Sequence, residues 1–211
     1  MRIGLFAGTA GPAASDLNSL AAFARDAEAR GFDSVWLPNI FGLDGVGACA
    51  IAGWETERIE LGTAVTPTYP RHPAALAQQA LTTQLACGDR FTLGIGLSHQ
   101  LVIEGMYGLS YAKPARHMAE YLEIIGPLLR GEKSDYEGES LTGKLALEVP
   151  KAAEVPLLVA ALGPVMLELA GKHSHGTTTW MTGPQTIEEH IVPHISAAAT
   201  AAGKPAPRIV C

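Results

Sequence analysis

The sequence has no long hydrophobic run. No apolar stretch among its 211 residues approaches the ~20 residues that a membrane-spanning helix requires. The opening segment MRIGLFAG carries one arginine and lacks an apolar stretch of signal-peptide length. We therefore expect a cytoplasmic protein that neither spans a membrane nor is exported.

Charged residues and cysteines are also scarce. Charged residues make up 17% of the chain, the net charge is -6, and lysines and arginines form no cluster, so we expect no nucleic-acid partner. Cys49, Cys87 and Cys211 are odd in number and widely spaced, which predicts neither a disulfide framework nor a metal knuckle. With 47% hydrophobic residues, the chain should fold as a single globular domain over residues 1–211.

What the sequence does contain is a regular alternation of predicted strands and helices. The helix predicted at 16–30 has apolar residues at helical spacing, with Ser15 placed to cap its start and Gly31 placed to end it. Strands are expected at 3–7, 33–38, 58–65, 90–97, 156–162, 176–181 and 207–211, helices at 16–30, 45–53, 74–85, 116–129, 163–174 and 185–203, and an inserted hairpin or loop at 133–150.

This order implies a parallel sheet, because parallel strands need crossover connections and crossovers are commonly helical. The sheet could be a closed (β/α)8 barrel of TIM type or an open doubly wound sheet. The segment GIGLSH at 94–99 lacks the third glycine of a dinucleotide-binding loop, which weakens the second interpretation. About seven strands can be counted where a complete barrel has eight. We therefore expect a barrel that is incomplete at its C-terminal end, either truncated or naturally short.

Four segments carry a resemblance to a known family. In chain order they are AEARGFDSVWLPNIFGLD, TERIELGTAVTPTYPRHPAALAQQALTTQLACGDRFTLGIGLSH, YEGE and VPLLVAALGPVMLELAGKHSHG. They resemble successive blocks of the bacterial luciferase-like monooxygenase superfamily and, within it, the branch of oxidoreductases that use the deazaflavin coenzyme F420. The resemblance covers nearly the whole chain, and the block 57–96 is its most specific part.

The resemblance implies a TIM-type barrel that holds a flavin or deazaflavin at the carboxyl ends of its strands, with hydride transfer as the usual chemistry. Family members often have a non-proline cis peptide bond behind the cofactor ring, at the end of the third strand. The matching bond here joins Ala64 to Val65. Pro67, Pro70 and Pro73 are expected to stiffen the loop that follows and to begin its helix.

The fourth predicted strand ends in further candidates for cofactor contact. Gly96 lets a ring or phosphate approach the backbone, while Ser98 and His99 offer hydrogen bonds; the alternative is a tight turn with a surface histidine. Asn39 and Ile40 match positions where deazaflavin enzymes of the family often have an acidic residue followed by histidine. Ile40 cannot transfer a proton, so that acid–base assignment is not available. Asn39 and His99 remain the candidates for catalysis, although Asn39 is equally explained as a turn residue.

Two more candidates lie at predicted strand ends. Gly163 and Pro164 stand where a strand meets a helix, so that backbone N–H groups favour a phosphate there, or the helix simply begins. Trp180, at the end of the strand 176–181, could stack on a ring or pack in the core or at the rim.

Other polar residues have ordinary explanations. Arg116, His117 and Glu120 share one face of a predicted helix, where they are expected to form a surface ion pair. Glu104 and Tyr107 follow the fourth strand and could face the site or solvent. His72 is expected at a helix start, and no metal site is expected because the remaining histidines of interest do not match a compact zinc pattern. These histidines are His173, His175, His190 and His194.

With the resemblance, these features predict an oxidoreductase that transfers a hydride between reduced coenzyme F420 and an unknown small organic substrate. The alternatives are an FMN-dependent monooxygenase of the same superfamily, or a shortened-barrel flavin-binding protein without turnover. Because an open sheet edge needs protection, we also expect a homodimer.

Overall fold

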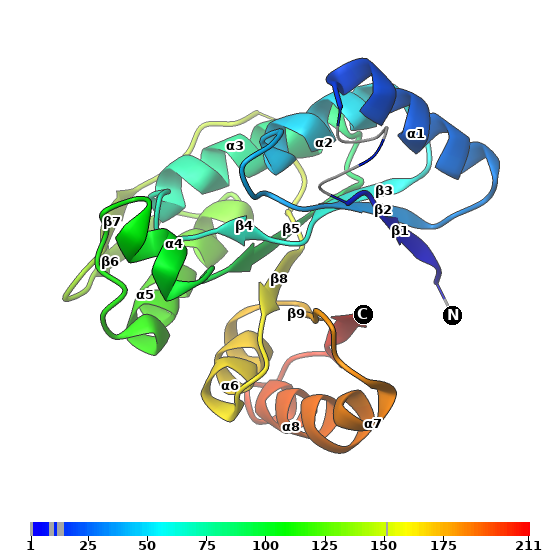
Figure 1. The fold of residues 1–211 in the computed structure, drawn as a ribbon. Helices are drawn as coiled ribbons and strands as arrows, with labels where there is room; N and C mark the ends of the chain where they lie inside the picture. The colour runs from blue at the N-terminus through cyan, green and yellow to red at the C-terminus, as the bar shows by residue number, and fades with distance from the viewer. Residues whose placement is uncertain (1, 9–10, 12–14, 151) are drawn as a thin grey trace.

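A computed structural model describes residues 2–8, 11, 15–150 and 152–211 and shows a curled sheet covered by helices (Figure 1). The strands of the main sheet are β1 Gly4–Phe6, β2 Ser34–Leu37, β3 Glu60–Thr63, β4 Thr66–Pro67, β5 Phe91–Gly96, β8 Leu157–Ala160, β9 Gly176–Thr178 and β10 Arg208–Val210. They run in the order β1-β2-β3-β5-β8-β9-β10, with β4 beside β5, and neighbouring strands pair in parallel.

Helices connect the consecutive strands of the main sheet, except that β4 follows β3 directly. They are α1 Leu17–Ala29, α2 Gly45–Trp54, α3 Pro73–Ala86, α4 Gln100–Gly105, α5 Pro114–Leu129, α6 Pro164–His173, α7 Pro184–Thr186, the π-helical segment η2 Ile187–Ile191, and α8 Val192–Ala201. An antiparallel hairpin, β6 Ser134–Glu137 and β7 Thr142–Leu145, lies between α5 and β8. The predicted alternation and the inserted hairpin are confirmed. The short elements β4 and α4 were not predicted, because two and six residues are too few to show a periodic pattern.

The ends of the long helices follow from local hydrogen bonds and left-handed residues. Asp16 caps α1, since its Oδ1 accepts from the Ser19 N–H at 2.9 Å, so the prediction that Ser15 is the cap was wrong by one residue. Asp16 offers a carboxylate oxygen at the position where the backbone is still extended. Gly31 ends α1 as predicted, with a φ of +84° that glycine adopts readily.

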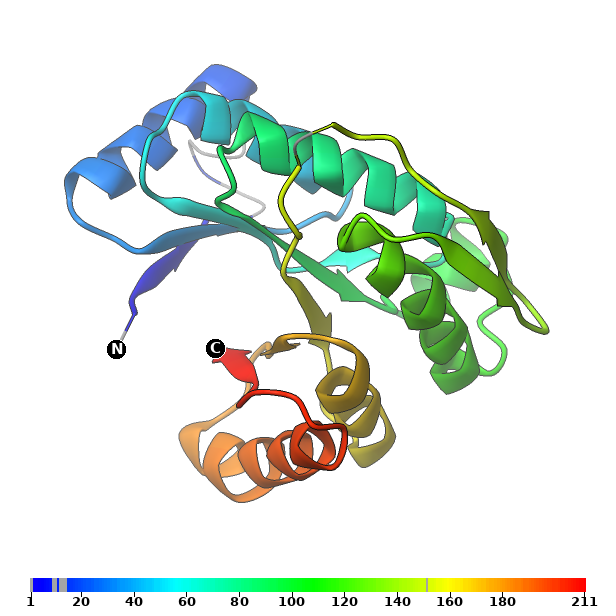
Figure 2. The ribbon, with the colours of Figure 1, turned by 180° about the vertical axis from the view of Figure 1, so that it is seen from behind.

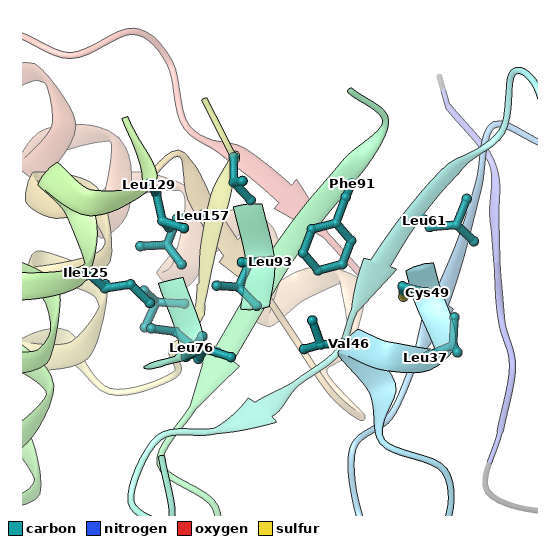
Figure 3. Packing of buried hydrophobic residues seen from close by; sticks show 14 of the residues in the cluster. Leu37, Val46, Cys49, Leu61, Leu76, Phe91, Leu93, Ile125, Leu129 and Leu157 are labelled. Atoms are coloured by element: carbon teal, nitrogen blue, oxygen red, sulfur yellow. The ribbon is translucent and has the colours of Figure 1, made fainter. Parts of the chain in front are cut away.

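The core lies between the sheet and the helices that cover its outer face. Figure 3 shows side chains of the central strands meeting side chains of α2, α3 and α5. Phe91, Leu93 and Ile95 of β5 are at most 1% exposed, and burial of each such side chain contributes about 1.5–3 kcal/mol. Because side chains alternate along a strand, the intervening residues Thr92, Gly94 and Gly96 face the inside of the curled sheet.

The curled sheet is a half-barrel. Its strands follow one another in chain order without the reversal of a doubly wound sheet, and within the described residues no pairing joins β10 to β1. The helices α1, α2 and α3 lie along β1 to β5, whereas α6, α7 and α8 gather beside β8 to β10, as both views show (Figure 2). The expectation of an incomplete TIM-type barrel is therefore confirmed. None of the helices in the described ranges is both long and apolar enough to cross a membrane.

Candidate functional site

The carboxyl ends of β3 and β5 are packed closely against each other. A Cβ at Gly96 would lie 2.6 Å from Cγ2 of Val65 and 3.2 Å from Cβ of Ala160. A Cβ at Gly94 would lie 2.0 Å from the carbonyl oxygen of Thr63. Glycine is required at both positions because the chain that follows β3 approaches β5 closely. The result is a closely packed strand end in which both glycines are buried and Val65 is partly exposed.

The peptide bond between Ala64 and Val65 is cis, as the resemblance implies. The Ala64 N–H donates to the Leu37 carbonyl at 2.8 Å, which ties the end of β3 to β2. On the other side, the Thr63 hydroxyl donates to the Gly94 carbonyl at 2.8 Å and accepts from the Gly94 N–H at 3.0 Å. The bulge is thus fixed to both neighbouring strands, and it presents Val65 beside the two glycines.

Beyond β5 the chain turns at Ser98 in a left-handed conformation. The φ of Ser98 is +63°, which is uncommon for a residue with a side chain. Ser98 is partly buried, and His99 follows as the exposed N-cap residue of α4. Gly96, Ser98 and His99 thus lie at the carboxyl end of β5, and their contact with a cofactor stays a prediction.

Apolar side chains are exposed around the same edge. Trp180 follows β9 with 70% of its surface exposed, and its ring centroid is 5.1 Å from that of Phe6, at the end of β1. Leu162, after β8, is 57% exposed. The strand predicted to reach Met181 ends at Thr178, so Trp180 lies in the loop and not in the core. Exposed aromatic rings at a barrel opening can contact the face of a planar ligand.

The helix α6 begins directly at this edge. Gly163 is its N-cap with extended backbone, and Pro164 occupies the first turn, as predicted. A Cβ at Gly163 would meet nothing within 4 Å among the described residues. The first-turn N–H groups of such a helix lack partners within the helix and favour an anion. The same geometry is also that of an ordinary helix start, so both alternatives stay open.

Asn39 bonds to the start of α2. The residue is 7% exposed, and its Oδ1 accepts from the Gly45 N–H at 2.8 Å. Of the two interpretations, this contact favours the turn residue, because the amide oxygen is committed to the backbone of its own loop. Ile40 is 56% exposed beside it.

A charged cluster occupies the other end of the barrel interior. Glu60, the first residue of β3, is 9% exposed. Its carboxylate accepts from Arg208 at 2.6 and 3.0 Å, from Arg2 at 2.7 Å and from the Thr92 hydroxyl at 2.6 Å. Burial alone would raise the pKa of Glu60, but the hydrogen bonds from Arg208 and Thr92 and the two positive charges lower it. The ion pair between Glu60 and Arg208 links β3 to β10 across the interior.

Trp36 packs within this cluster. The Arg208 guanidinium lies 5.3 Å from the centre of the Trp36 ring, and the indole N–H donates to the Ser34 hydroxyl at 2.9 Å. The ring covers Gly62, where a Cβ would be 2.3 Å from it. Sequence reasoning missed this cluster; the available signal was a single acidic residue, Glu60, inside the apolar strand RIELGTAV.

An aromatic stack lies outside the barrel interior, at the end of β4. The Tyr69 ring is parallel to that of His117 at 3.9 Å and 3°, and it stacks on Tyr111 at 5.1 Å and 29°. His117 Nε2 is 3.0 Å from the Thr68 hydroxyl, and the Tyr111 hydroxyl donates to the Ser98 carbonyl at 3.2 Å. Burial lowers the pKa of His117 to about 4, against the opposing charge of Glu120.

Comparison with known proteins identifies the family. The family model described as luciferase-like monooxygenase matches residues 1–211, the whole chain. This chain belongs to the luciferase-like monooxygenase family. The resemblance seen in the sequence is thereby confirmed at the level of the family.

Two curated relatives narrow the comparison within the luciferase-like family. The 5,10-methylenetetrahydromethanopterin reductase of Methanolobus tindarius is 33% identical over 186 residues, which cover 88% of this chain and 56% of the relative. The F420-dependent glucose-6-phosphate dehydrogenase of Microbacterium testaceum is 33% identical over 207 residues, which cover 89% of this chain and 60% of the relative. The chain therefore spans less than two thirds of the length of these relatives.

A solved luciferase-like structure has the same fold. The coenzyme F420 dependent tetrahydromethanopterin reductase from Methanopyrus kandleri superposes with a TM-score of 0.83 at 24% identity. The match covers 99% of this chain and 64% of that chain. The fold of the half-barrel is therefore that of a luciferase-like barrel over its whole described length.

The face of α5 that was expected to form a surface ion pair packs against the hairpin instead. Glu120 is 4% exposed, and its carboxylate accepts three successive backbone N–H groups, of residues 139–141, at 3.0, 2.9 and 2.8 Å. Arg116 pairs with Glu139 of the hairpin, and His117 joins the aromatic stack. The prediction was wrong because helical spacing does not reveal what covers the helix face.

The remaining polar candidates have separate partners. His72 caps α3 as predicted, with Nδ1 accepting from the Ala74 N–H at 3.2 Å. Glu104 of α4 accepts from the Tyr111 N–H at 3.1 Å, whereas Tyr107 is 44% exposed. The remaining histidines have separate surroundings. His173 contacts Glu123, and His175 contacts Glu154 and the Leu157 N–H. His190 contacts the Leu162 carbonyl, and His194 contacts the His190 carbonyl. Over the described ranges, no group of three or more potential ligands is placed to hold a metal ion.

Proposed function

We propose that the chain carries the cofactor-binding part of a coenzyme F420-dependent oxidoreductase that acts on a small organic substrate. The observation that carries this proposal is the close packing of the Ala64–Val65 bulge on Gly94 and Gly96 at the carboxyl ends of the strands. In barrels of this kind, active sites lie at that end. The F420-dependent relative and the F420-dependent structure named above support the choice of cofactor.

The residues present fit a planar ring. A Cβ on either glycine would occupy space already taken by Val65 or by backbone, so the glycines let the bulge pack directly on β5 and leave the partly exposed Val65 to face a planar ring. When bound, a deazaflavin supplies hydride transfer, and the carbon that replaces one flavin nitrogen makes it slow to react with oxygen. The protein's contribution is to bind and orient the ring and to exclude water.

Each candidate residue has a proposed role at this surface. Val65, with Ala64, supports one face of the ring, and Gly96 permits its close approach. Ser98 offers a hydrogen bond, and His99 is the titratable side chain beside the substrate. The start of α6, at Gly163 and Pro164, is proposed to bind an anionic part of the cofactor. Trp180 covers an apolar part of the ring. Asn39 is proposed to hold the β2–α2 turn and not to contact the ring.

Equilibrium binding tests this function. Purified protein is titrated with coenzyme F420 and, separately, with FMN at matched concentrations, and binding is followed by fluorescence. We expect F420 to bind at least about tenfold more tightly, a difference of about 1.4 kcal/mol. Tighter binding of FMN, or binding of neither compound, would contradict the proposal.

A pair of tryptophan variants localises the binding. Trp180→Ala is expected to weaken F420 binding about fivefold, because an aromatic contact contributes about 0.5–1.5 kcal/mol. The matched control is Trp54→Ala on α2, since Trp54 is 77% exposed and lies away from the carboxyl edge. Equal affinities of the two variants would place the cofactor elsewhere.

The wider organisation is also a proposal. We propose one domain over residues 1–211, a homodimer and a cytoplasmic location. A single hydrophobic cluster that runs from Ala7 to Ile195 supports the single domain, and the free, buried thiols of Cys49 and Cys87 agree with a reducing compartment. The sheet edges at β1 and β10 support self-association. Light scattering on the purified chain measures the oligomeric state, and a monomeric mass would overturn the dimer.

A further inference from the structure

The aromatic stack joins three segments that are distant in the sequence. Tyr69 belongs to the loop after β4, Tyr111 precedes α5, and His117 lies on α5 itself. Their rings overlap in the order Tyr111, Tyr69, His117. His117, which is uncharged at neutral pH because burial lowers its pKa to about 4, lies flat against Tyr69.

This stack holds the end of β5 at two points. The Thr68 N–H donates to the Gly96 carbonyl at 3.0 Å, and the Thr68 hydroxyl is bonded to His117. The Tyr111 hydroxyl donates to the Ser98 carbonyl at 3.2 Å. One carbonyl belongs to the last residue of β5 and the other to the turn that follows it, and both segments carry proposed cofactor contacts.

Tyr111 is itself fixed at several places. Its N–H donates to the Glu104 carboxylate at 3.1 Å, and its ring stacks on Tyr69. The Tyr69 hydroxyl, in contrast, is buried and has no hydrogen-bond partner among the described residues. The two tyrosines therefore differ in function within one stack: Tyr69 contributes its ring, whereas Tyr111 contributes both its ring and its hydroxyl.

We infer that Tyr111 is a positioning residue of the cofactor site: its hydroxyl holds Ser98 in the left-handed conformation, and the stack on Tyr69 and His117 holds Tyr111. This inference rests on the proposed function for its consequence in cofactor binding. Its structural part, the control of the Ser98 turn, is independent of any ligand.

The test compares phenylalanine variants, which keep each ring and remove one hydroxyl. In the ligand-free protein, Tyr111→Phe is expected to increase amide hydrogen exchange about fivefold in the segment 97–101, because one hydrogen bond to that turn is lost. Tyr69→Phe removes a hydroxyl without a described partner and should leave the exchange of this segment unchanged. Unchanged exchange in Tyr111→Phe would overturn the inference.

Cofactor binding supplies the second measurement. Tyr111→Phe should weaken F420 binding about fivefold and shift the fluorescence of the bound cofactor, while the free energy of unfolding changes little. Tyr136→Phe, on the remote strand β6, is the matched control and should bind as the unmodified protein does. If the unmodified protein binds no F420 while the exchange result holds, only the proposed function fails. If it binds F420 and Tyr111→Phe binds equally well with the same fluorescence, the positioning role is refuted.

Discussion

The two ends of the barrel strands are built from opposite kinds of residue. At the amino end, Glu60 is buried and bonded to Arg208, Arg2 and Thr92, and Trp36 packs beside them. At the carboxyl end, β5 ends in Gly96 beside the Ala64–Val65 bulge, and the apolar rings of Phe6 and Trp180 are exposed. The molecule thus changes from a buried, charged layer at one end of the strands to partly exposed apolar side chains at the other.

This difference separates stability from binding. The polar groups at the amino end satisfy one another, so they stabilise the half-barrel and have little capacity left for a ligand. The apolar rings at the carboxyl end remain exposed, so they contribute little to stability and are free to contact a ligand. Substitutions at the two ends should therefore affect different measurements.

The largest expected effect is at the amino end. Glu60→Ala should lower the free energy of unfolding by about 3 kcal/mol, because it leaves Arg208 without its carboxylate and removes the link between β10 and β3. Urea unfolding measures this change. Glu57→Ala, an exposed acidic residue three positions earlier, is the control and should change stability by less than about 0.5 kcal/mol. Equal stability of the two variants would mean that the charged cluster does not hold the barrel.

A smaller effect, mainly on cofactor binding and less on stability, is expected at the carboxyl end. Gly96→Ala places a Cβ 2.6 Å from Val65, so the bulge must shift. We expect F420 binding to weaken about tenfold, with a stability loss of only about 1–2 kcal/mol from overpacking. Gly183→Ala is the control, since a Cβ there meets nothing within 4 Å among the described residues. If Gly96→Ala binds F420 normally, the bulge that packs on Gly96 does not support the cofactor.

The fold could be predicted from the sequence because each element carries a local signal. Apolar strands such as 90–97 alternate with amphipathic helices such as 16–30, and glycines end the helices at Gly31 and Gly88. The errors were local. The cap of α1 is Asp16 where Ser15 was predicted, and Trp180 lies after the strand that was predicted to contain it. Short elements such as α4 were not predicted, because α4 spans less than two helical turns.

The candidate site was predicted less completely, because its chemistry depends on contacts between distant segments. The positions of Gly96 and Ser98 follow from the end of one strand, and the cis bond at Ala64 came from the resemblance. Nothing in the local sequence pairs Glu60 with Arg208, 148 positions away. Likewise, the spacing of α5 shows that His117 and Glu120 share a face, but not that a hairpin and an aromatic stack cover it.

The smallest expected effect sharpens the comparison through pH. The folded-state pKa of His117 is about 4, below its ordinary 6.5. The unfolded chain therefore binds a proton in this interval that the folded chain does not, so the contribution of His117 to stability is complete above about pH 6.5 and declines toward pH 4.

The variant His117→Gln tests this decline. It should remove a part on the order of 1 kcal/mol, because the ring is partly exposed and screened. Urea unfolding across the interval measures the change. His175, whose pKa burial also lowers, accounts for a remaining part. The lowered pKa of Glu60 acts in the same direction but at lower pH: its stabilisation is present above the ordinary carboxyl range and is lost at more acid pH. Acid should thus weaken the outer stack at the carboxyl end before the charged cluster at the amino end. If the free energy of unfolding of His117→Gln depends on pH as that of the unmodified protein does, the stack does not respond to acid before the charged cluster.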